Sequence, residues 1–104
     1  MIIVAFDGSS VVLSDERWRH IVLRHPELRE KRGLILDAVT RPDEVYADSA
    51  GGVHVLKRLS GDGSDFLVVV YAKSGVEGYI RTAYYTSSRK KSRRYRGFRR
   101  LRLS

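Results

Sequence analysis

The 104-residue chain contains no cysteine, and it has only two prolines, one tryptophan and one methionine. Without cysteine the chain can form neither a disulfide bond nor a thiolate metal site, and cysteine-based catalysis is excluded. No apolar run approaches the roughly 20 residues that a helix needs to span a bilayer. From its length and these absences we expect one domain that acts in the cytoplasm and has no membrane partner.

Acidic residues are missing from one end of the chain. Residues 87–104 contain nine of the twenty basic residues and no acid, whereas residues 1–86 hold 11 basic and 12 acidic residues. The net charge of +8 is therefore concentrated in the last part of the chain. This distribution predicts a near-neutral globular domain over residues 1–86 and a basic C-terminal tail over residues 87–104.

Local signals predict the first half of the domain. The dipeptide Asp7-Gly8 lies between two β-rich runs, which is typical of an N-terminal β-hairpin. A helix is expected from Ser14, a good N-cap, to about His25, because Pro26 disfavours helical geometry at the residue before it. A second helix is expected over residues 27–40, since a proline suits a first turn.

After residue 43 the hydrophobic period changes from 3.6 to two. Strands are expected over residues 44–48, 53–59, 65–72 and 79–86. The short turns between them favour an antiparallel meander. The predicted fold is therefore α+β: an N-terminal β-hairpin, two helices, and then a four-stranded antiparallel sheet packed on the helices.

Two of the three histidines lie in the first predicted helix. His25 shares the apolar stripe of Trp18, while His20 lies on a neighbouring face with Arg24. An imidazole suits a general acid or base because its unperturbed pKa is ~6.5. The alternative is that His20 is a solvated helix residue and that His25 is hydrogen-bonded and partly buried.

Polar side chains on the predicted strands are further candidates. His54 and Arg58 share one face of their strand, where a guanidinium could hold a phosphate. Thr82 and Tyr84 share a face with Ile80 in the last strand, and their hydroxyls could bind a phosphate or donate a proton. The alternative is an ordinary sheet surface, because threonine and tyrosine are favoured in strands.

The basic tail interleaves cations with aromatic rings. Cations contact phosphates and rings stack on bases, so this pattern indicates nucleic-acid binding. The expected nucleic-acid-binding residues are Arg81, Arg89, Lys90, Lys91, Arg93, Arg94, Tyr95, Arg96 and Phe98. The alternatives are a solubilising tail, a contact with anionic lipid, or docking on an acidic partner. Leu101 and Leu103 alternate with arginines, so the end could also pair as an edge strand.

The residue spacing does not indicate a metal or a cofactor. His20 and His25 are five positions apart, off the i, i+4 spacing that places two ligands on one helical face. The chain also has no Walker loop and no Rossmann glycine pattern. We therefore expect neither a metal nor a cofactor.

Several short motifs in this order resemble a known family. They are His20-Ile21-x-x-Arg24-His25-Pro26-Glu27, Arg41-Pro42-Asp43-Glu44-Val45-Tyr46, Val53-x-Val55-x-Lys57-Arg58, Val68-Val69-Val70 and Arg81-Thr82-Ala83-Tyr84. Together they cover most of the chain, from residue 14 to about residue 90. The combination resembles the phage-associated nucleases of the barnase–EndoU–colicin–RelE-like fold, and more loosely the small RelE-like toxin relatives.

The resemblance implies a metal-independent RNA endonuclease, in which the 2′-hydroxyl attacks the adjacent phosphate. Such a protein could be a toxin or a mobile-element effector, with tRNA, mRNA or ribosomal RNA as its partner. The catalytic residues that the resemblance implies are His25 or His20 as acid or base, Arg24, Lys57 and Arg58 as phosphate stabilisers, and Thr82 and Tyr84 as positioning groups. Two alternatives are a non-catalytic RNA- or ribosome-binding module and a protein-interaction member of a toxin–antitoxin pair, bound to an acidic antitoxin.

Overall fold

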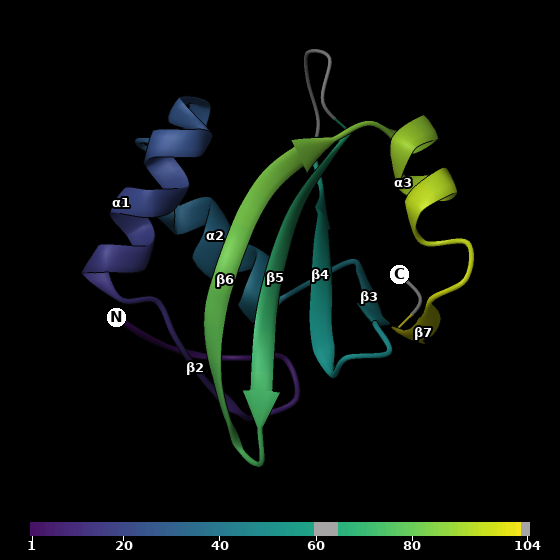
Figure 1. The fold of residues 1–104 in the computed structure, drawn as a ribbon, viewed down its shortest axis with the longest axis horizontal. Coiled ribbons are helices and arrows are strands. Elements are labelled where there is room, and N and C mark those ends of the chain that lie inside the picture. The colour runs from purple at the N-terminus through teal and green to yellow at the C-terminus, as the bar shows by residue number, and fades with distance from the viewer. Residues whose placement is uncertain (60–64, 103–104) are drawn as a thin grey trace.

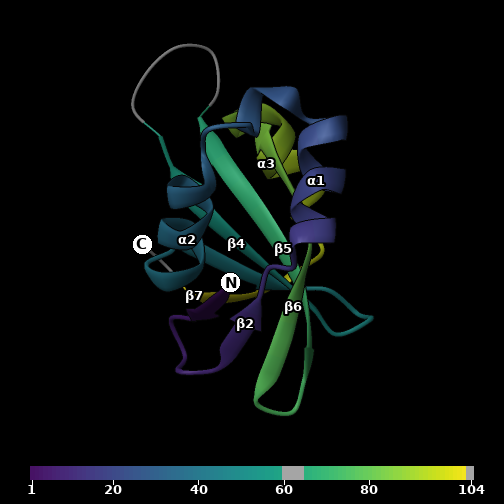
Figure 2. The same ribbon diagram turned by 90° about the vertical axis from the view of Figure 1, so that its left-hand side faces the viewer.

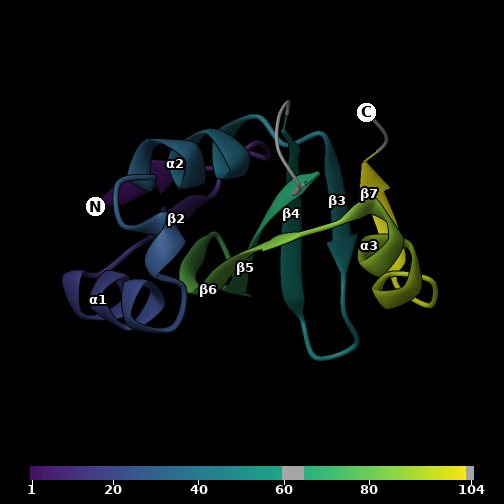
Figure 3. The same ribbon diagram turned by 90° about the horizontal axis from the view of Figure 1, so that it is seen from above.

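The computed structural model describes residues 1–59 and 65–102. Its elements in chain order are β1 (Ile2–Val4), β2 (Ser10–Val12), α1 (Asp15–Arg24), the 3₁₀ turn η1 (Pro26–Leu28), α2 (Arg32–Thr40), β3 (Glu44–Ala47), β4 (Gly52–Arg58), β5 (Phe66–Ser74), β6 (Glu77–Thr86), α3 (Ser88–Arg94) and β7 (Arg99–Arg102). Within these residues the strands form one sheet in the order β1-β2-β6-β5-β4-β3-β7. Helices α1 and α2 lie on one side of this sheet and α3 on the other (Figures 1 and 3).

The fold is α+β, but the predicted two helices and four-stranded antiparallel sheet are wrong. The described residues form three α-helices and a seven-stranded mixed sheet. Strand β2 pairs in parallel with β6, which brings the N-terminal hairpin into the sheet, and β7 pairs with β3 at the opposite end. Both additions satisfy backbone groups that the four-stranded arrangement would leave unpaired at its edges.

The first helix begins as the sequence predicts, whereas the second begins later. The Ser14 hydroxyl accepts a hydrogen bond from the Arg17 N–H at 3.1 Å and caps α1. The helix expected over residues 27–40 is instead the short turn η1 followed by α2, which starts at Arg32. Leu28 in η1 is fully buried, so the chain turns to place this side chain in the core before α2 begins.

One face of the sheet carries the main apolar core. Val55, Val69 and Ala83 are cross-strand partners and form a fully buried row across β4, β5 and β6. Ile21 of α1 and Ile35 of α2 are buried in the same cluster. Figure 2 shows both helices in front of the strands that they cover. In the part of the chain that the structure describes, no helix has the length and apolar character needed to cross a membrane.

The opposite face of the sheet has a second apolar cluster, which the C-terminal segment covers. Its buried members are Tyr46, Leu56, Phe66, Val68, Val70 and Tyr95. The Tyr95 ring follows α3 and stacks on the Tyr46 ring at 4.6 Å between centroids. The basic segment is thus folded over residues 88–102, with Tyr95 turned inward and the cations of α3 exposed or half-buried.

A β-bulge in β6 changes which side chains share a face. Val70 pairs with Thr82 while the next residue of β5, Tyr71, pairs with Ile80, so one extra residue lies between the two pairs. As a result Ile80 lies in the main core, and the predicted face shared by Ile80, Thr82 and Tyr84 is wrong. The alternation of side chains does not continue across a bulge.

A buried carboxylate holds α3 against the sheet. Glu44 of β3 is 2% exposed, and its Oε1 accepts a hydrogen bond from the Tyr46 hydroxyl at 2.6 Å. The Lys91 ammonium donates a hydrogen bond to Oε2 at 3.1 Å and lies 2.8 Å from Oε1. The guanidinium groups of Arg58 and Arg100 lie 3.7 and 3.8 Å from the same carboxylate. Burial alone would raise the pKa of Glu44, but the hydrogen bonds and nearby cations bring it below its usual value.

The substitution Glu44→Gln is expected to lower the free energy of unfolding by about 2 kcal/mol at neutral pH, because the hydrogen bonds to a charged acceptor are lost. The folded-state pKa of Glu44 lies below the unfolded value of 4.5. The stabilisation is therefore complete above the unfolded value and disappears as the pH falls through the folded pKa. Urea denaturation of both proteins at a series of pH values should show their difference shrinking in acid.

The matched control is Asp37→Asn, which removes a partly exposed carboxylate from its i, i+4 pair with Arg41 and from its pair with Lys57. Exposed pairs of this kind contribute less than about 1 kcal/mol. An equal loss of stability in the two variants, or a Glu44→Gln effect that stays constant with pH, would contradict the anchoring role of Glu44.

Candidate functional site

A hollow of about 480 Å³ lies between the end of β6 and α3. It is lined by Tyr84, Tyr85, Thr86, Lys90, Arg93 and Arg94. The chain passes directly from β6 into α3, and the Ser87 hydroxyl caps the helix by accepting a hydrogen bond from the Lys90 N–H at 3.2 Å. Asp65 accepts a further hydrogen bond from the Ser88 N–H at 2.7 Å. This tight connection brings the cations of α3 next to the hydroxyl groups of β6.

His25 approaches Tyr84 from the end of α1. The centroids of the two rings lie 6.3 Å apart, with the ring planes tilted by 35°. The His25 side chain is 31% exposed, and its Nδ1 lies 4.0 Å from Glu27 Oε2, an ion pair when the imidazole is protonated. A histidine and a tyrosine that are distant in the sequence are therefore neighbours beside the hollow.

Arg94 covers the tyrosine side of the hollow. Its guanidinium carbon lies 5.6 Å from the centroid of the Tyr84 ring and 6.0 Å from that of Tyr95. Both distances are in the range of cation–π attraction, which holds the guanidinium over the rings. A positive charge is thus placed within reach of any group that meets the Tyr84 hydroxyl.

A chain of hydrogen bonds runs from Tyr84 into the protein. The hydroxyls of Tyr84 and Tyr95 are 3.5 Å apart, and the Tyr95 hydroxyl is 2.9 Å from Nδ1 of His54. Nε2 of His54 is 2.9 Å from Oδ2 of Asp48. Burial raises the pKa of Tyr95 far above its ordinary value, so its phenol keeps its proton.

The Asp48 carboxylate determines the direction of these hydrogen bonds. Its Oδ1 accepts hydrogen bonds from the N–H groups of Ala50 and Gly52 at 2.9 and 2.7 Å. The hydrogen bond from His54 is the main reason that the pKa of Asp48 lies below its usual value. An ionised carboxylate only accepts hydrogen bonds. Nε2 of His54 therefore donates to Asp48, and in the neutral imidazole Nδ1 is the nitrogen that accepts from the Tyr95 hydroxyl.

Glycine is required where the chain turns between β3 and β4. A side chain at Gly52 would overlap the Asp48 carboxylate, and Gly51 has a φ of +88°, a conformation that favours glycine. The two glycines thus allow Asp48 to close the turn on its own backbone while its second oxygen faces His54. The local sequence of this turn sets the end of the hydrogen-bonded chain.

Only some of the residues that the sequence predicted to be catalytic lie close together in the structure. His25 and Tyr84 are neighbours, and the half-buried Thr82 lies on the same sheet face as Tyr84. His20 is exposed and lines a different hollow, together with Ser14 at the start of α1. His20 and His25 therefore do not form a histidine pair at one site.

The predicted phosphate-stabilising residues are also dispersed. Lys57 lies on the helix-covered side of the sheet, where its ammonium donates to the Arg41 carbonyl at 2.7 Å and pairs with Asp37 at 3.5 Å. Arg58 lies over the Phe66 ring beside Glu44. Arg24 is exposed in the last turn of α1. None of these three cations lines the hollow beside Tyr84.

The predicted nucleic-acid-binding residues fall into two groups. The exposed members are Arg81, Arg89, Lys90, Arg93, Arg94 and Arg96. Lys91 is bound to Glu44, and Tyr95 is buried. The Phe98 ring packs edge-on against His54 at 5.1 Å between centroids. The aromatic rings expected to stack on bases therefore pack on the protein itself, whereas most of the cations face solvent.

The sequence interpretation missed Asp48 and Tyr95 as partners of His54. An Asp followed by small residues and two glycines is a recognisable turn signal, and it could have indicated that Asp48 closes a hairpin near His54. No local signal connects His54 with Tyr95, because the two residues are 41 positions apart in the chain.

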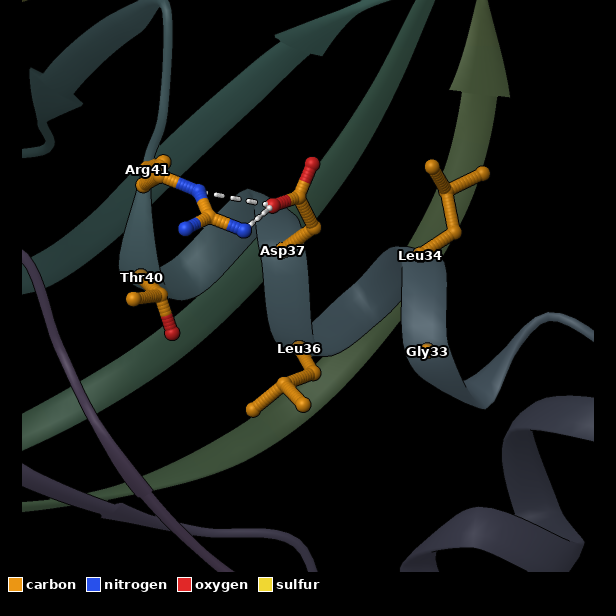
Figure 4. Close-up of a pocket in the computed structure, with 6 residues that line it drawn as sticks. All are labelled: Gly33, Leu34, Leu36, Asp37, Thr40 and Arg41. Carbon is orange, nitrogen blue, oxygen red and sulfur yellow. Dashed lines mark hydrogen bonds and ion pairs between the residues drawn. The ribbon is translucent and has the colours of Figure 1, made fainter.

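A separate hollow along α2 offers less chemistry. It is lined by Gly33, Leu34, Leu36, Asp37, Thr40 and Arg41. Arg41 points toward Asp37 and donates two hydrogen bonds to its Oδ1, at 2.8 and 3.1 Å (Figure 4). The two charged groups pair with each other, whereas two tyrosines and three cations line the hollow beside Tyr84.

Comparisons with protein-family models, with curated proteins and with solved structures gave no match to this chain. The resemblance to phage-associated nucleases therefore stays a prediction. Among residues 1–59 and 65–102, no three His, Asp or Glu side chains are grouped in a way that could hold a metal ion.

Proposed function

We propose that the protein is a metal-independent RNA endonuclease that acts at the hollow between β6 and α3. The observation that best supports this proposal is the pairing of His25 with Tyr84, at 6.3 Å between ring centroids, beside a hollow lined by cations of α3. An imidazole and a phenol can each move a proton, and cations stabilise the charge that develops on a phosphate.

In the proposed reaction the RNA supplies its own nucleophile. The 2′-hydroxyl oxygen forms a bond to the adjacent phosphorus while the bond from phosphorus to the 5′ oxygen breaks. One proton leaves the 2′-hydroxyl and another is delivered to the departing 5′ oxygen, which yields a 2′,3′-cyclic phosphate and a 5′-hydroxyl. His25 and Tyr84 are the proposed proton-transfer pair, and Arg94 stabilises the phosphate oxygens.

Charge on the surface supports RNA as the ligand. Lys90, Arg93 and Arg94 line the hollow, and Arg81 and Arg96 are also exposed. Such cations bind the phosphate backbone of an RNA whatever its base sequence. The proposal therefore extends to tRNA, mRNA and ribosomal RNA. Together with the family resemblance, these features lead us to propose a toxin or mobile-element effector that acts in the cytoplasm and that an acidic antitoxin could cover.

A second candidate is a non-catalytic RNA- or ribosome-binding module. The observation that favours it is that the cations of α3 need no acid or base to bind a phosphate backbone. The two candidates differ in what they predict for His25, which is essential for cleavage but not for binding by charge. The experiments below separate them.

For cleavage, purified protein is incubated with total RNA and with tRNA in excess EDTA. The wild type is expected to leave 2′,3′-cyclic phosphate ends, and His25→Ala is expected to lower the rate by about 100-fold or more, because an acid–base group is lost. The matched control is His20→Ala, which removes the exposed histidine of the same helix and should retain the wild-type rate. RNA binding without cleavage by all three proteins would favour the binding module.

For binding, the double substitution Arg93→Gln/Arg94→Gln is expected to weaken RNA affinity. A plot of the logarithm of the RNA association constant against the logarithm of the salt concentration should have a slope that is shallower by about 1 to 2, because fewer counterions are released from the RNA. Fluorescence anisotropy with a labelled RNA oligonucleotide at several salt concentrations measures both quantities. Arg41→Gln, which changes the exposed arginine at the C-cap of α2 (Figure 4), should leave them unchanged. Equal effects in the two variants would argue against the hollow as the RNA site.

A further inference from the structure

We infer that the general base of the proposed cleavage is the pair formed by the buried His54 and the partly exposed Asp48, which the substrate reaches through the hydroxyls of Tyr84 and Tyr95. The inference rests on the proposed function and deepens it, because it gives the two proton transfers to different histidines. Tyr84 is the catalytic residue that meets the 2′-hydroxyl. Tyr95, His54 and Asp48 are positioning residues, which receive and stabilise a proton without touching RNA.

The orientation of the hydrogen bonds favours this direction of transfer. The Tyr95 proton points to Nδ1 of His54 at 2.9 Å, because Nε2 donates to Asp48. The Tyr95 oxygen can then accept from the Tyr84 hydroxyl, 3.5 Å away, beside its contact with the Arg94 guanidinium. Each donor in this chain faces inward, from the hollow toward His54. The acceptor at its inner end is an unprotonated imidazole nitrogen.

A phenol at neutral pH cannot act as a base until its own proton leaves, since its unperturbed pKa is about 10. The chain provides a destination for that proton. As the 2′-hydroxyl proton passes to the Tyr84 oxygen, the Tyr84 proton passes to Tyr95 and the Tyr95 proton passes to Nδ1 of His54. The 2′ oxygen attacks phosphorus, and His54 ends as an imidazolium.

The burial of Tyr95 and His54 determines how the protons can move along the chain of hydrogen bonds. Burial raises the pKa of Tyr95 far above its ordinary value, so a free tyrosinate at this position is strongly disfavoured. The transfers through Tyr95 must therefore be concerted. The imidazolium that results at His54 is stabilised by the Asp48 carboxylate at 2.9 Å. Its other close neighbours are the rings of Tyr95 and Phe98, which exclude water.

His25 is left with the complementary role of acid. Its side chain is 31% exposed and its Nδ1 lies 4.0 Å from the Glu27 carboxylate, which pairs with the protonated ring. His25 donates its proton to the departing 5′ oxygen, so one proton enters through Tyr84 as another leaves from His25. After release of the product, exchange with water returns both histidines to their starting states.

The test compares single-turnover cleavage of an RNA oligonucleotide by the full-length wild type and by Tyr84→Phe, Tyr95→Phe and the double variant. Each single variant is expected to lose about 100-fold or more in rate, with an unchanged RNA dissociation constant. The double variant should be no slower than Tyr84→Phe, because residues that act as one unit are not additive. The matched control is Tyr79→Phe, which removes the hydroxyl of an exposed tyrosine of β6 and should retain the wild-type rate.

A full cleavage rate in Tyr95→Phe, or losses that multiply in the double variant, would overturn the relay and leave the nuclease proposal standing. Absence of cleavage by the wild type would overturn the proposed function and the relay with it. The nitrogen chemical shifts of His54 in the wild type provide a readout that needs no variant. A protonated Nε2 and a bare Nδ1 support the relay, and the opposite tautomer overturns it.

Discussion

Burial of Tyr95 against the second face of the sheet is the interaction on which the candidate site depends. Its ring stacks on Tyr46 and closes the apolar cluster of Leu56 and Val68, while its hydroxyl lies between Tyr84 and His54. One side chain thus provides packing and a polar link. Without it, the segment that follows β6 would lose its buried aromatic contact with the sheet, and His54 would lose the partner of its Nδ1.

The concentration of positive charge at the end of the chain is compatible with folding because of Glu44. A buried carboxylate is costly unless it is paired, and here Lys91, Arg58 and Arg100 surround it. The remaining cations of α3 face solvent and the hollow beside Tyr84. The segment therefore uses part of its charge for structure and leaves part for a ligand. Removal of the whole C-terminal segment would abolish the structural role and the ligand-binding role together. Point substitutions therefore test the two roles separately.

The two histidines at the candidate site lie in contrasting environments. His25 is partly exposed near a carboxylate at the end of a helix, whereas His54 is buried with both nitrogens hydrogen-bonded. Groups placed in such different surroundings are suited to opposite proton-transfer roles. The proposed nuclease needs one donor and one acceptor, and Tyr84 lies between them. This arrangement, rather than any single residue, supports the functional proposal.

Local signals in the sequence determined several features correctly. The hairpin at Asp7-Gly8, the start of α1 at Ser14, and the positions of the central strands all follow from short-range patterns of turns, caps and apolar residues. The candidate acid–base residues His25 and Tyr84 could also be named from their chemistry. Their proximity could not be predicted, because it depends on how α1 packs against β6.

The remaining features of the fold and of the candidate site were decided by the tertiary structure alone. The parallel pairing of β2 with β6, the bulge beside Thr82 and the folding of residues 88–102 onto the sheet each depend on contacts between distant segments. The link from His54 to Tyr95 spans 41 positions and has no local signature. Composition marked the C-terminal segment as basic, but Tyr95 and Phe98, which pack on a sheet face that α1 and α2 leave uncovered, made it part of the fold.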